Sequence, residues 1–196
     1  NQSGGEMSRI IVVGAGIAGM SAAYELREKL PADTEITVFG DGPRFSFTPS
    51  NPWLAVGWRQ PEQITLDAGE HLAKKNIRFV PRPVSRIEPE SKSVATGQGD
   101  VHAYDYLLIC TGPRLAFEEV PDGFTHSVCT TPHAGEAWMH YQKFLENPGP
   151  VVVGAVQGAS CFGPAYEFIM ILDADLRKRK LRDKVPMTFV SSEPYI

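Results

Sequence analysis

A glycine-rich turn between an apolar strand and a helix constrains the fold of this chain more than any other feature. Residues 9–13, RIIVV, form a continuous apolar run, and GAGIAG follows at once. Gly14, Gly16 and Gly19 fit the G-x-G-x-x-G pattern in the strand, turn and helix setting that gives the pattern its meaning. The first glycine makes the turn, the second lets the backbone approach a pyrophosphate, and the third lets the helix close on the strand. We therefore predict dinucleotide binding, with a glycine turn that holds no ligand as the alternative.

The order of strand, glycine turn and helix occurs twice. The first helix ends at Pro31 and leads to the strand 35–39, and a further buried strand is predicted in YDYLLICTG. After a break at 147–150, the apolar run VVVG, a turn, a helix and the strand 187–192 repeat the opening pattern. Strands that alternate with helices predict an α/β fold with a parallel sheet, here in two Rossmann-like parts.

We expect three regions in the chain. A first dinucleotide-binding, Rossmann-like domain covers 7–113, a connecting segment covers 114–150, and the start of a second Rossmann-like domain covers 151–196. Because one helix and two strands cannot bury both faces of a sheet, we expect a truncated chain and a longer native protein. The region 40–63, rich in Gly, Pro, Ser and aromatic residues, is predicted as a long functional loop, with a helix near 64–75 after it.

Composition excludes several classes of function. The 196 residues are 42% hydrophobic, with a formal net charge of −4, which is typical of a soluble globular protein and offers no basic surface to nucleic acid. No apolar run approaches the roughly 18 residues of a membrane-spanning helix. The five histidines show no metal-ligand spacing, so no metal site is predicted.

The three cysteines stand in different settings. Cys110 lies within an apolar strand, where we interpret it as a packing residue. Cys129 and Cys161 each lie a few residues before a helix that has a proline near its start, where free N–H groups and the macrodipole favour a thiolate. Two thiols of this kind favour redox chemistry, with two unrelated buried cysteines as the alternative.

Other candidate site residues follow strand ends and helix starts. Thr111 and Gly112 follow a buried strand, and ligands gather at the carboxyl ends of strands in such sheets. Asp41 stands one position after the place of the usual ribose-binding acid, so it either binds ribose or is a solvated turn residue. Glu167 lies about one turn into the helix after Cys161, as a charge partner of the helix end or as a proton carrier for the thiol.

The second glycine turn departs from the first. In Gly154-Ala155-Val156, a β-branched valine takes the place of the glycine that should lie against a pyrophosphate. The strand that follows, MTFVSSEP, offers no clear acid or arginine for a cofactor ribose. We predict that this turn does not bind a nicotinamide cofactor.

Four segments of the chain resemble sulfide:quinone oxidoreductases, which are flavoproteins of the disulfide reductase superfamily. The segments are GAGIAGMSAAYEL, PSNPWLAVGW, YDYLLICTGP and GASCFGPAYEF. The resemblance runs from about residue 9 to 196 and covers the N-terminal half of such an enzyme. It implies FAD as cofactor, and oxidation of sulfide to polysulfide or sulfur with transfer of electrons to a membrane quinone.

The resemblance also implies where the enzyme works. The full-length protein would be peripheral to a membrane, attached through its C-terminal half, with sulfide and quinone as partners and an oligomer as one option. The 196-residue chain would be soluble and inactive by itself, since a third redox cysteine and the closing flavin-binding segment would lie beyond Ile196.

Residue by residue, the resemblance assigns redox roles to Cys161 and Cys129 and proton transfer to Glu167. Hydrosulfide would attack an oxidised bridge that includes Cys161, and electrons would then pass through FAD to quinone. The serine common at the ribose position of the family is Gly40 here, which leaves the ribose to Asp41 or to backbone groups. The implied FAD contacts are Gly14, Ala15, Gly16, Ala18, Gly19, Gly40, Asp41, Thr48, Val84, Thr111 and Gly112.

Three alternatives stay open at this point. They are the flavoprotein subunit of a flavocytochrome c sulfide dehydrogenase, a type II NADH dehydrogenase, and a non-catalytic dinucleotide-binding module. The first would be expected to carry an export signal before Met7. The altered second glycine turn and the paired cysteines argue against the second.

Overall fold

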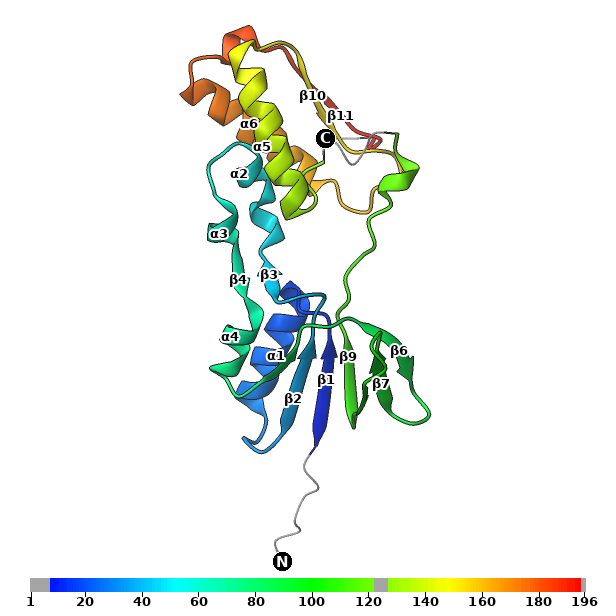
Figure 1. The fold of residues 1–196 in the computed structure, drawn as a ribbon. Helices are drawn as coiled ribbons and strands as arrows, with labels where there is room; N and C mark the ends of the chain where they lie inside the picture. The colour runs from blue at the N-terminus through cyan, green and yellow to red at the C-terminus, as the bar shows by residue number, and fades with distance from the viewer. Residues whose placement is uncertain (1–7, 122–126, 195–196) are drawn as a thin grey trace, which may run out of the picture. The chain divides into compact units, whose positions relative to one another are not determined.

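The fold is taken from a computed structural model of the chain that describes residues 8–121 and 127–194. The chain forms two compact units (Figure 1). The first unit comprises the described residues up to Ser46 together with Thr65–Arg114. The second comprises Phe47–Ile64 together with the described residues from Leu115 onward.

The first unit is built around a four-stranded parallel sheet with the strand order β5-β2-β1-β9. In its register, Val13 lies opposite both Phe39 and Ile109, and Phe39 lies opposite Val80. All four strands therefore end at the same edge, where the segments that follow them meet. The strands are β1 (Arg9–Val13), β2 (Glu35–Phe39), β5 (Arg78–Val80) and β9 (Tyr106–Ile109).

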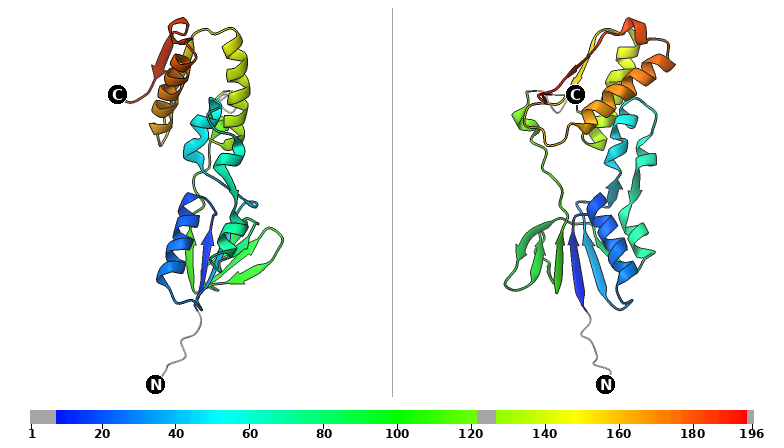
Figure 2. Two further views of the ribbon diagram at one scale, coloured as in Figure 1. Left: turned by 90° about the vertical axis from the view of Figure 1, so that its left-hand side faces the viewer. Right: turned by 180° about the vertical axis from the view of Figure 1, so that it is seen from behind.

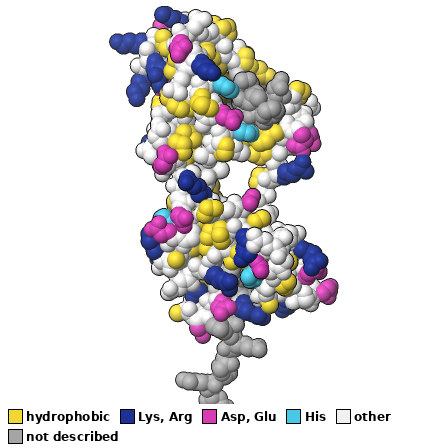
Figure 3. Space-filling model, in the orientation of Figure 1, with side chains coloured by type: hydrophobic (Ala, Val, Ile, Leu, Met, Phe, Trp, Pro, Cys, Tyr) yellow, Lys and Arg dark blue, Asp and Glu magenta, His cyan; other side chains and the backbone are white. Residues whose placement is uncertain are grey.

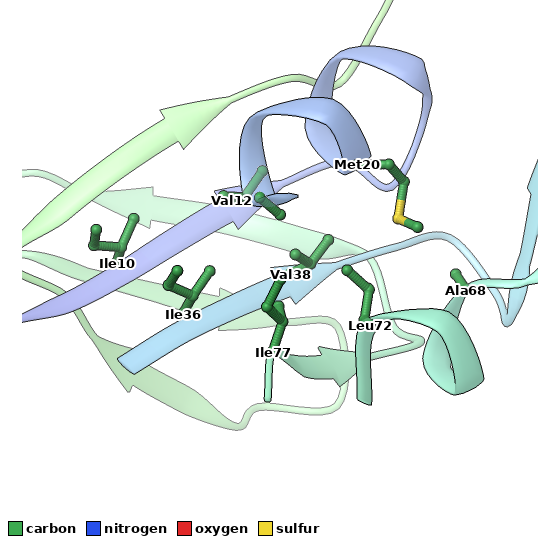
Figure 4. Close-up of a cluster of buried hydrophobic side chains, with 9 residues drawn as sticks. Ile10, Val12, Met20, Ile36, Val38, Ala68, Leu72 and Ile77 are labelled. Atoms are coloured by element: carbon green, nitrogen blue, oxygen red, sulfur yellow. The ribbon is translucent and has the colours of Figure 1, made fainter. Parts of the chain in front are cut away.

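Two helices, α1 (Ile17–Lys29) and α4 (Ala68–Ala73), cover one face of this sheet (Figures 1 and 2). Side chains alternate between the two faces along each strand, so every second residue points toward these helices. Cys110 is partly buried against the resulting core, which confirms its predicted packing role. The core, drawn in Figure 4, contains Ile10, Val12, Met20, Ala23, Ile36, Val38, Ala68, Leu72 and Ile77.

A small antiparallel sheet with the order β6-β7-β8 covers the other face. Both faces of the parallel sheet are covered, so both faces of the central strand β1 need apolar side chains. Its sequence, residues 9–13, is therefore a continuous apolar run and does not alternate between apolar and polar residues. The buried side chains between the layers are Ile11, Val13, Phe39, Val80, Val94 and Tyr104. The remaining strands of the unit are β3 (Arg44–Ser46), β4 (Thr65–Asp67), β6 (Val84–Glu88), β7 (Ser93–Thr96) and β8 (Val101–Ala103).

The second unit contains two parallel strands and two long helices. The short helix α2 (Asn51–Ala55) packs against both long helices, although it precedes them by many residues in the sequence. The long elements are β10 (Val151–Gly154), β11 (Met187–Val190), α5 (Thr131–Glu146) and α6 (Gly163–Lys178). The shorter ones are η1 (Thr48–Ser50), α3 (Pro61–Ile64), η2 (Phe117–Glu119) and η3 (Arg182–Lys184).

The segment Phe47–Ile64 is where sequence and structure differ most. It was expected to be a loop of the first domain, but it contains short helices and belongs to the second unit. The reason is burial, since Val56 is completely inaccessible and shares a core with Leu172 and Leu176 of α6. The second unit thus joins this segment to the described residues from Leu115 onward, whereas the expected division was 7–113, a connecting segment 114–150 and 151–196.

One smaller expectation needs correction. The predicted helix near 64–75 is wrong at its start, because 65–67 form β4 in an antiparallel pair with β3 and only 68–73 are helical. The buried residues of α1 are Gly19, Met20 and Ala23. Within the described part of the chain, no helix has the length and apolar character needed to cross a membrane.

Candidate functional site

Two glycines of the turn after β1 are required by close backbone contacts. Gly14 has a φ of +110°, and a Cβ there would lie 2.1 Å from the carbonyl oxygen of Cys110. The N–H of Gly14 donates a 2.8 Å hydrogen bond to the carbonyl of Phe39. A Cβ at Gly19 would lie 1.8 Å from the carbonyl oxygen of Gly14. Only glycine fits at these two positions, because the strand ends and the helix approach each other so closely.

Gly16 is glycine for a different reason. A Cβ at this position would meet no atom within 4 Å, and the residue is exposed. Gly16 is the N-cap of α1, and no side chain caps this helix, whose first turn carries no acidic residue. Free N–H groups and the positive end of the helix dipole therefore stand beside open space. A pyrophosphate group fits at this position, because it is an anion and needs close access to the backbone.

Other predicted cofactor contacts lie at the same edge of the sheet. Gly40 follows β2 directly, and its N–H donates to the carbonyl of Val80 at 3.0 Å. It is buried, and a Cβ there would press on Ala15 and the Phe79 ring, both at 3.0 Å. Glycine at position 40 therefore allows the backbone to pack closely. The side chain accessible at this turn is that of Asp41, which follows Gly40 and is exposed.

The loop after β9 completes this edge. The N–H of Cys110 donates a 2.7 Å hydrogen bond to the carbonyl of Val13, so the loop begins beside the end of β1. Thr111 and Gly112 are exposed, and Gly112 has a φ of +70°. Val84, the first residue of β6, is half-buried and packs against the core between the two sheets. The structure thus brings the predicted contacts of the first unit, apart from Val84, to one edge of its parallel sheet.

The predicted contact Thr48 and the predicted redox residues belong to the second unit. Thr48 is exposed and begins η1. Cys129 and Cys161 are both exposed and neither forms a disulfide, nor does Cys110. Glu167 is exposed on α6, beyond the first turn of that helix.

The two exposed thiols precede the two long helices. Cys129 donates its N–H to Oγ of Ser127 at 3.0 Å, and the next residue, Thr130, caps α5 by accepting a 3.3 Å hydrogen bond from the N–H of His133. Cys161 lies two residues before the start of α6, which no side chain caps. Each cysteine therefore immediately precedes the N-cap residue of a helix of 16 residues.

Sequence reasoning missed Asn51, the first residue of α2, which contacts the first residue of α5. Its side chain is only 1% exposed, and its Oδ1 accepts a 3.1 Å hydrogen bond from the hydroxyl of Thr131. Nδ2 of Asn51 is buried without a hydrogen-bond partner among the described residues. The available signal was a polar residue inside the otherwise apolar and proline-containing segment PSNPWLAV.

Sequence reasoning also missed Asp175, a carboxylate on α6 that is only 1% exposed. It accepts hydrogen bonds from Nε1 of Trp58 at 2.7 Å, the hydroxyl of Tyr141 at 2.8 Å and Nε of Arg179 at 2.6 Å. Burial, and then the hydrogen bond to Asp175, raise the pKa of Tyr141, so its hydroxyl stays protonated and donates. The signal was a charged residue within the apolar stripe of α6, next to Leu176.

The second glycine turn has a structural explanation of its own. Gly154 ends β10, and a Cβ there would lie 2.2 Å from the carbonyl oxygen of Val190 on β11. Close pairing of the two strands therefore requires this glycine, without any ligand. Val156, which follows in the turn, is 52% exposed.

The basic run RKRKLR, residues 177–182, lies at the end of α6. Its three arginines form ion pairs with aspartates of the same unit. Figure 3 shows Lys and Arg side chains gathered over this end, at the upper left of the view. Nε of Arg177 lies 2.6 Å from Oδ2 of Asp173, and Arg182 contacts the other carboxylate oxygen. The run is thus a solvated helix end. In the described part of the chain, no three His, Cys, Asp or Glu side chains are grouped to hold a metal ion.

Comparison with known proteins adds independent findings. The pattern of the pyridine nucleotide-disulphide oxidoreductase family matches residues 8–162. The sulfide-quinone reductase of Aquifex aeolicus (strain VF5) is 46% identical over 188 residues, which are 95% of this chain and 44% of that protein. The mitochondrial sulfide:quinone oxidoreductase of Dictyostelium discoideum is 26% identical, over 95% of this chain and 42% of its own length.

A solved structure agrees with the sequence comparison. The X-ray structure of the sulfide:quinone oxidoreductase from Aquifex aeolicus matches with a TM-score of 0.88 and 45% identity, over 96% of this chain and 44% of that one. The chain therefore spans less than half the length of each of these relatives.

Proposed function

Since this chain belongs to the pyridine nucleotide-disulphide oxidoreductase family, we propose that it carries the flavin-binding turn and two redox cysteines of a sulfide:quinone oxidoreductase. The whole enzyme would oxidise sulfide to polysulfide or sulfur and pass the electrons through FAD to a quinone. The observation that carries the proposal is the 46% identity to a sulfide-quinone reductase over 95% of the chain. Because the chain spans 44% of that relative, the activity belongs to the whole protein, and we expect the 196 residues alone to lack turnover.

The edge of the sheet in the first unit fits FAD. Family members are FAD-binding flavoproteins. Gly16 leaves open space beside the uncapped start of α1, which suits the pyrophosphate. The exposed Asp41 would reach the ribose, and Thr111 with Gly112 would contact the cofactor from the loop after β9. Bound FAD supplies the two-electron acceptor of the reaction.

The exposed thiols would perform the sulfur chemistry. Hydrosulfide attacks one sulfur of an oxidised bridge in which Cys161 takes part, so an S–S bond to the incoming sulfur forms as the bridge bond breaks. The attacked cysteine becomes a persulfide, and the other leaves as a thiolate that holds the electron pair donated by sulfide. Glu167, exposed on α6, would take up the proton released in this step.

The proposal is tested by Cys161→Ser in the whole enzyme. The variant should keep its FAD, because Cys161 belongs to the second unit and not to the glycine turn, but sulfide should no longer bleach the flavin in a stopped-flow experiment. Cys110→Ala is the control, since Cys110 is a packing residue, and it should bleach like the parent enzyme. Normal bleaching in Cys161→Ser would refute the proposed role.

The alternatives make different predictions for the same enzyme. A type II NADH dehydrogenase would be bleached by NADH, and a flavocytochrome c subunit would reduce a haem protein in preference to quinone. A non-catalytic module would bind a dinucleotide without turnover. The proposal expects bleaching by sulfide and reoxidation by quinone.

We also propose that the whole enzyme lies at a membrane surface, because quinones are dissolved in the lipid. The prediction is that it sediments with quinone-containing vesicles. Recovery of all enzyme in the supernatant would argue against this location.

A further inference from the structure

We propose that Tyr166 and Glu193 are specificity-determining residues that close the second glycine-turn unit to the ribose of NADH and NADPH. Tyr166 lies on α6, and Glu193 follows β11. The inference goes beyond the proposed sulfide reaction, because it concerns a second nucleotide position that this reaction does not use.

The two glycine-turn units of the chain differ in the acid that follows their second strand. Each contains a strand, a glycine turn, a helix and a second, parallel strand. In dinucleotide-binding units of this kind, an acidic side chain beyond the second strand accepts hydrogen bonds from the ribose of the cofactor. Asp41 follows β2 by two residues and is exposed. Glu193 follows β11 by three residues, and its carboxylate is already bonded within its own unit.

Two side chains donate hydrogen bonds to one carboxylate oxygen of Glu193. The hydroxyl of Tyr166 donates to Oε2, and Oγ of Ser191 donates to the same oxygen at 3.3 Å. The N–H of Glu193 in turn donates to Oγ of Ser191 at 3.1 Å, which fixes the acid relative to the end of β11. A ribose hydroxyl would therefore have to displace the tyrosine hydroxyl from this oxygen.

The ring of Tyr166 is held in place by the strand. It stacks on the ring of Phe189 in β11, with the centroids 4.6 Å apart and the planes inclined by 28°. The hydrogen bond to Glu193 raises the pKa of Tyr166, so its hydroxyl stays protonated and donates. The tyrosine side chain thus connects the start of the helix, where a pyrophosphate would bind, with the acid that would hold the ribose.

The turn between β10 and α6 is a second obstacle to a dinucleotide. The N–H of Ala155 donates to the carbonyl of Val190 at 3.1 Å, so this turn begins beside the segment that carries Glu193. Val156 takes the place of the glycine that would let the backbone approach a pyrophosphate. The valine and the bond between the tyrosine and the acid therefore act on two different parts of a cofactor.

The test measures binding of NADH to the whole enzyme by isothermal titration calorimetry. The parent enzyme should show no binding up to about 1 mM NADH. Val156→Gly reopens the turn but keeps the bond between Tyr166 and Glu193, so it should bind NADH weakly. Adding Tyr166→Phe removes the hydroxyl and keeps the ring on Phe189, and it should tighten binding about tenfold or more.

Two further variants make the test specific. Tyr24→Phe is the matched control, since it also removes a tyrosine hydroxyl, one that donates to the carbonyl of His71 in the first unit. Added to Val156→Gly, it should leave the affinity for NADH unchanged. Glu193→Gln, added to the variant with both Val156→Gly and Tyr166→Phe, should abolish the gain, because the ribose then loses its acid. If Tyr166→Phe fails to fold, Tyr166→Leu replaces it, with the same expected direction.

Three results would overturn the inference. They are binding of NADH to the parent enzyme, no tighter binding when the tyrosine hydroxyl is removed from the folded Val156→Gly variant, and a gain in affinity that persists with Glu193→Gln. The titration uses neither sulfide nor quinone, so it does not decide the proposed reaction. The flavin-bleaching test of Cys161→Ser does not decide the role of this tyrosine.

Discussion

The indole nitrogen of Trp58 donates a 2.7 Å hydrogen bond to Oδ1 of Asp175, a residue 117 positions further along the chain. The carboxylate that receives it is almost completely buried and also binds Tyr141 and Arg179. A single acidic residue thus joins an early segment of the chain to two late helices.

Asp175→Ala should therefore lower the free energy of unfolding by about 3 kcal/mol, because buried donors lose their acceptor. Trp58→Phe removes only one hydrogen bond and should cost about 1 kcal/mol. Urea denaturation followed by circular dichroism measures both. Equal stability of the two variants would contradict the central role given to the carboxylate.

Two substitutions in the glycine turn should have different effects, one on cofactor binding and the other on folding. A Cβ at Gly16 meets no atom within 4 Å, so Gly16→Ala should fold with an unchanged melting temperature but bind FAD about tenfold or more weakly, a loss of about 1.4 kcal/mol. Gly14→Ala should lose more than about 2 kcal/mol of stability, because its φ is +110° and its Cβ would clash with Cys110. Thermal unfolding and titration of the whole apoenzyme with FAD measure the two effects. A Gly16→Ala protein that binds FAD normally would disprove the pyrophosphate assignment.

Gly57→Ala should destabilise the second unit by about 3 kcal/mol, since it combines a left-handed backbone with a clash against the Trp138 ring. Gly158 provides the comparison, because its φ is +85° but its surroundings are open. Gly158→Ala should therefore cost only the backbone term of about 1 kcal/mol. Similar melting temperatures for the two variants would show that the contact with Trp138 does not limit the packing.

Asp173 should make stability depend on acid pH. Hydrogen bonds from Arg177 and then Arg182 lower the pKa of its carboxyl group below 3.8, the usual value. A depressed folded-state pKa adds stability that is fully present above 3.8 and is lost as the pH falls through the lower, folded-state value. The parent chain should melt higher than Asp173→Asn at neutral pH, and the difference should shrink as the pH falls below 3.8. A difference that stays constant as the pH falls further below 3.8 would exclude this linkage.

Much of the first unit was predictable, because its features are local. The run RIIVV with the turn GAGIAG specifies a buried strand, a tight turn and a helix from sterics and hydrophobicity alone. The packing role of Cys110 also followed from its neighbours in the strand. The assignment of FAD contacts and redox roles to particular residues stays a prediction.

The second unit was less predictable, because its decisive contacts join distant residues. Helical periodicity places Asp175 on the apolar face of α6, where a hydrophobic residue would be expected. No residue near Asp175 in the sequence indicates that Trp58 is its hydrogen-bond partner. In the same way, the prolines and glycines of residues 40–63 predicted a loop, although the burial of Val56 makes this segment part of another unit's core.

By itself, the sequence determined the strand, turn and helix at residues 9–29 and the position of both exposed thiols before helices, since these depend on neighbouring residues. Only the tertiary structure decided which unit takes up the segment Phe47–Ile64. That choice depends on the burial of Val56 and on a hydrogen bond to the Asp175 carboxylate from a donor 117 residues away. Both contacts join residues that are distant in the sequence, so a local sequence pattern cannot predict them.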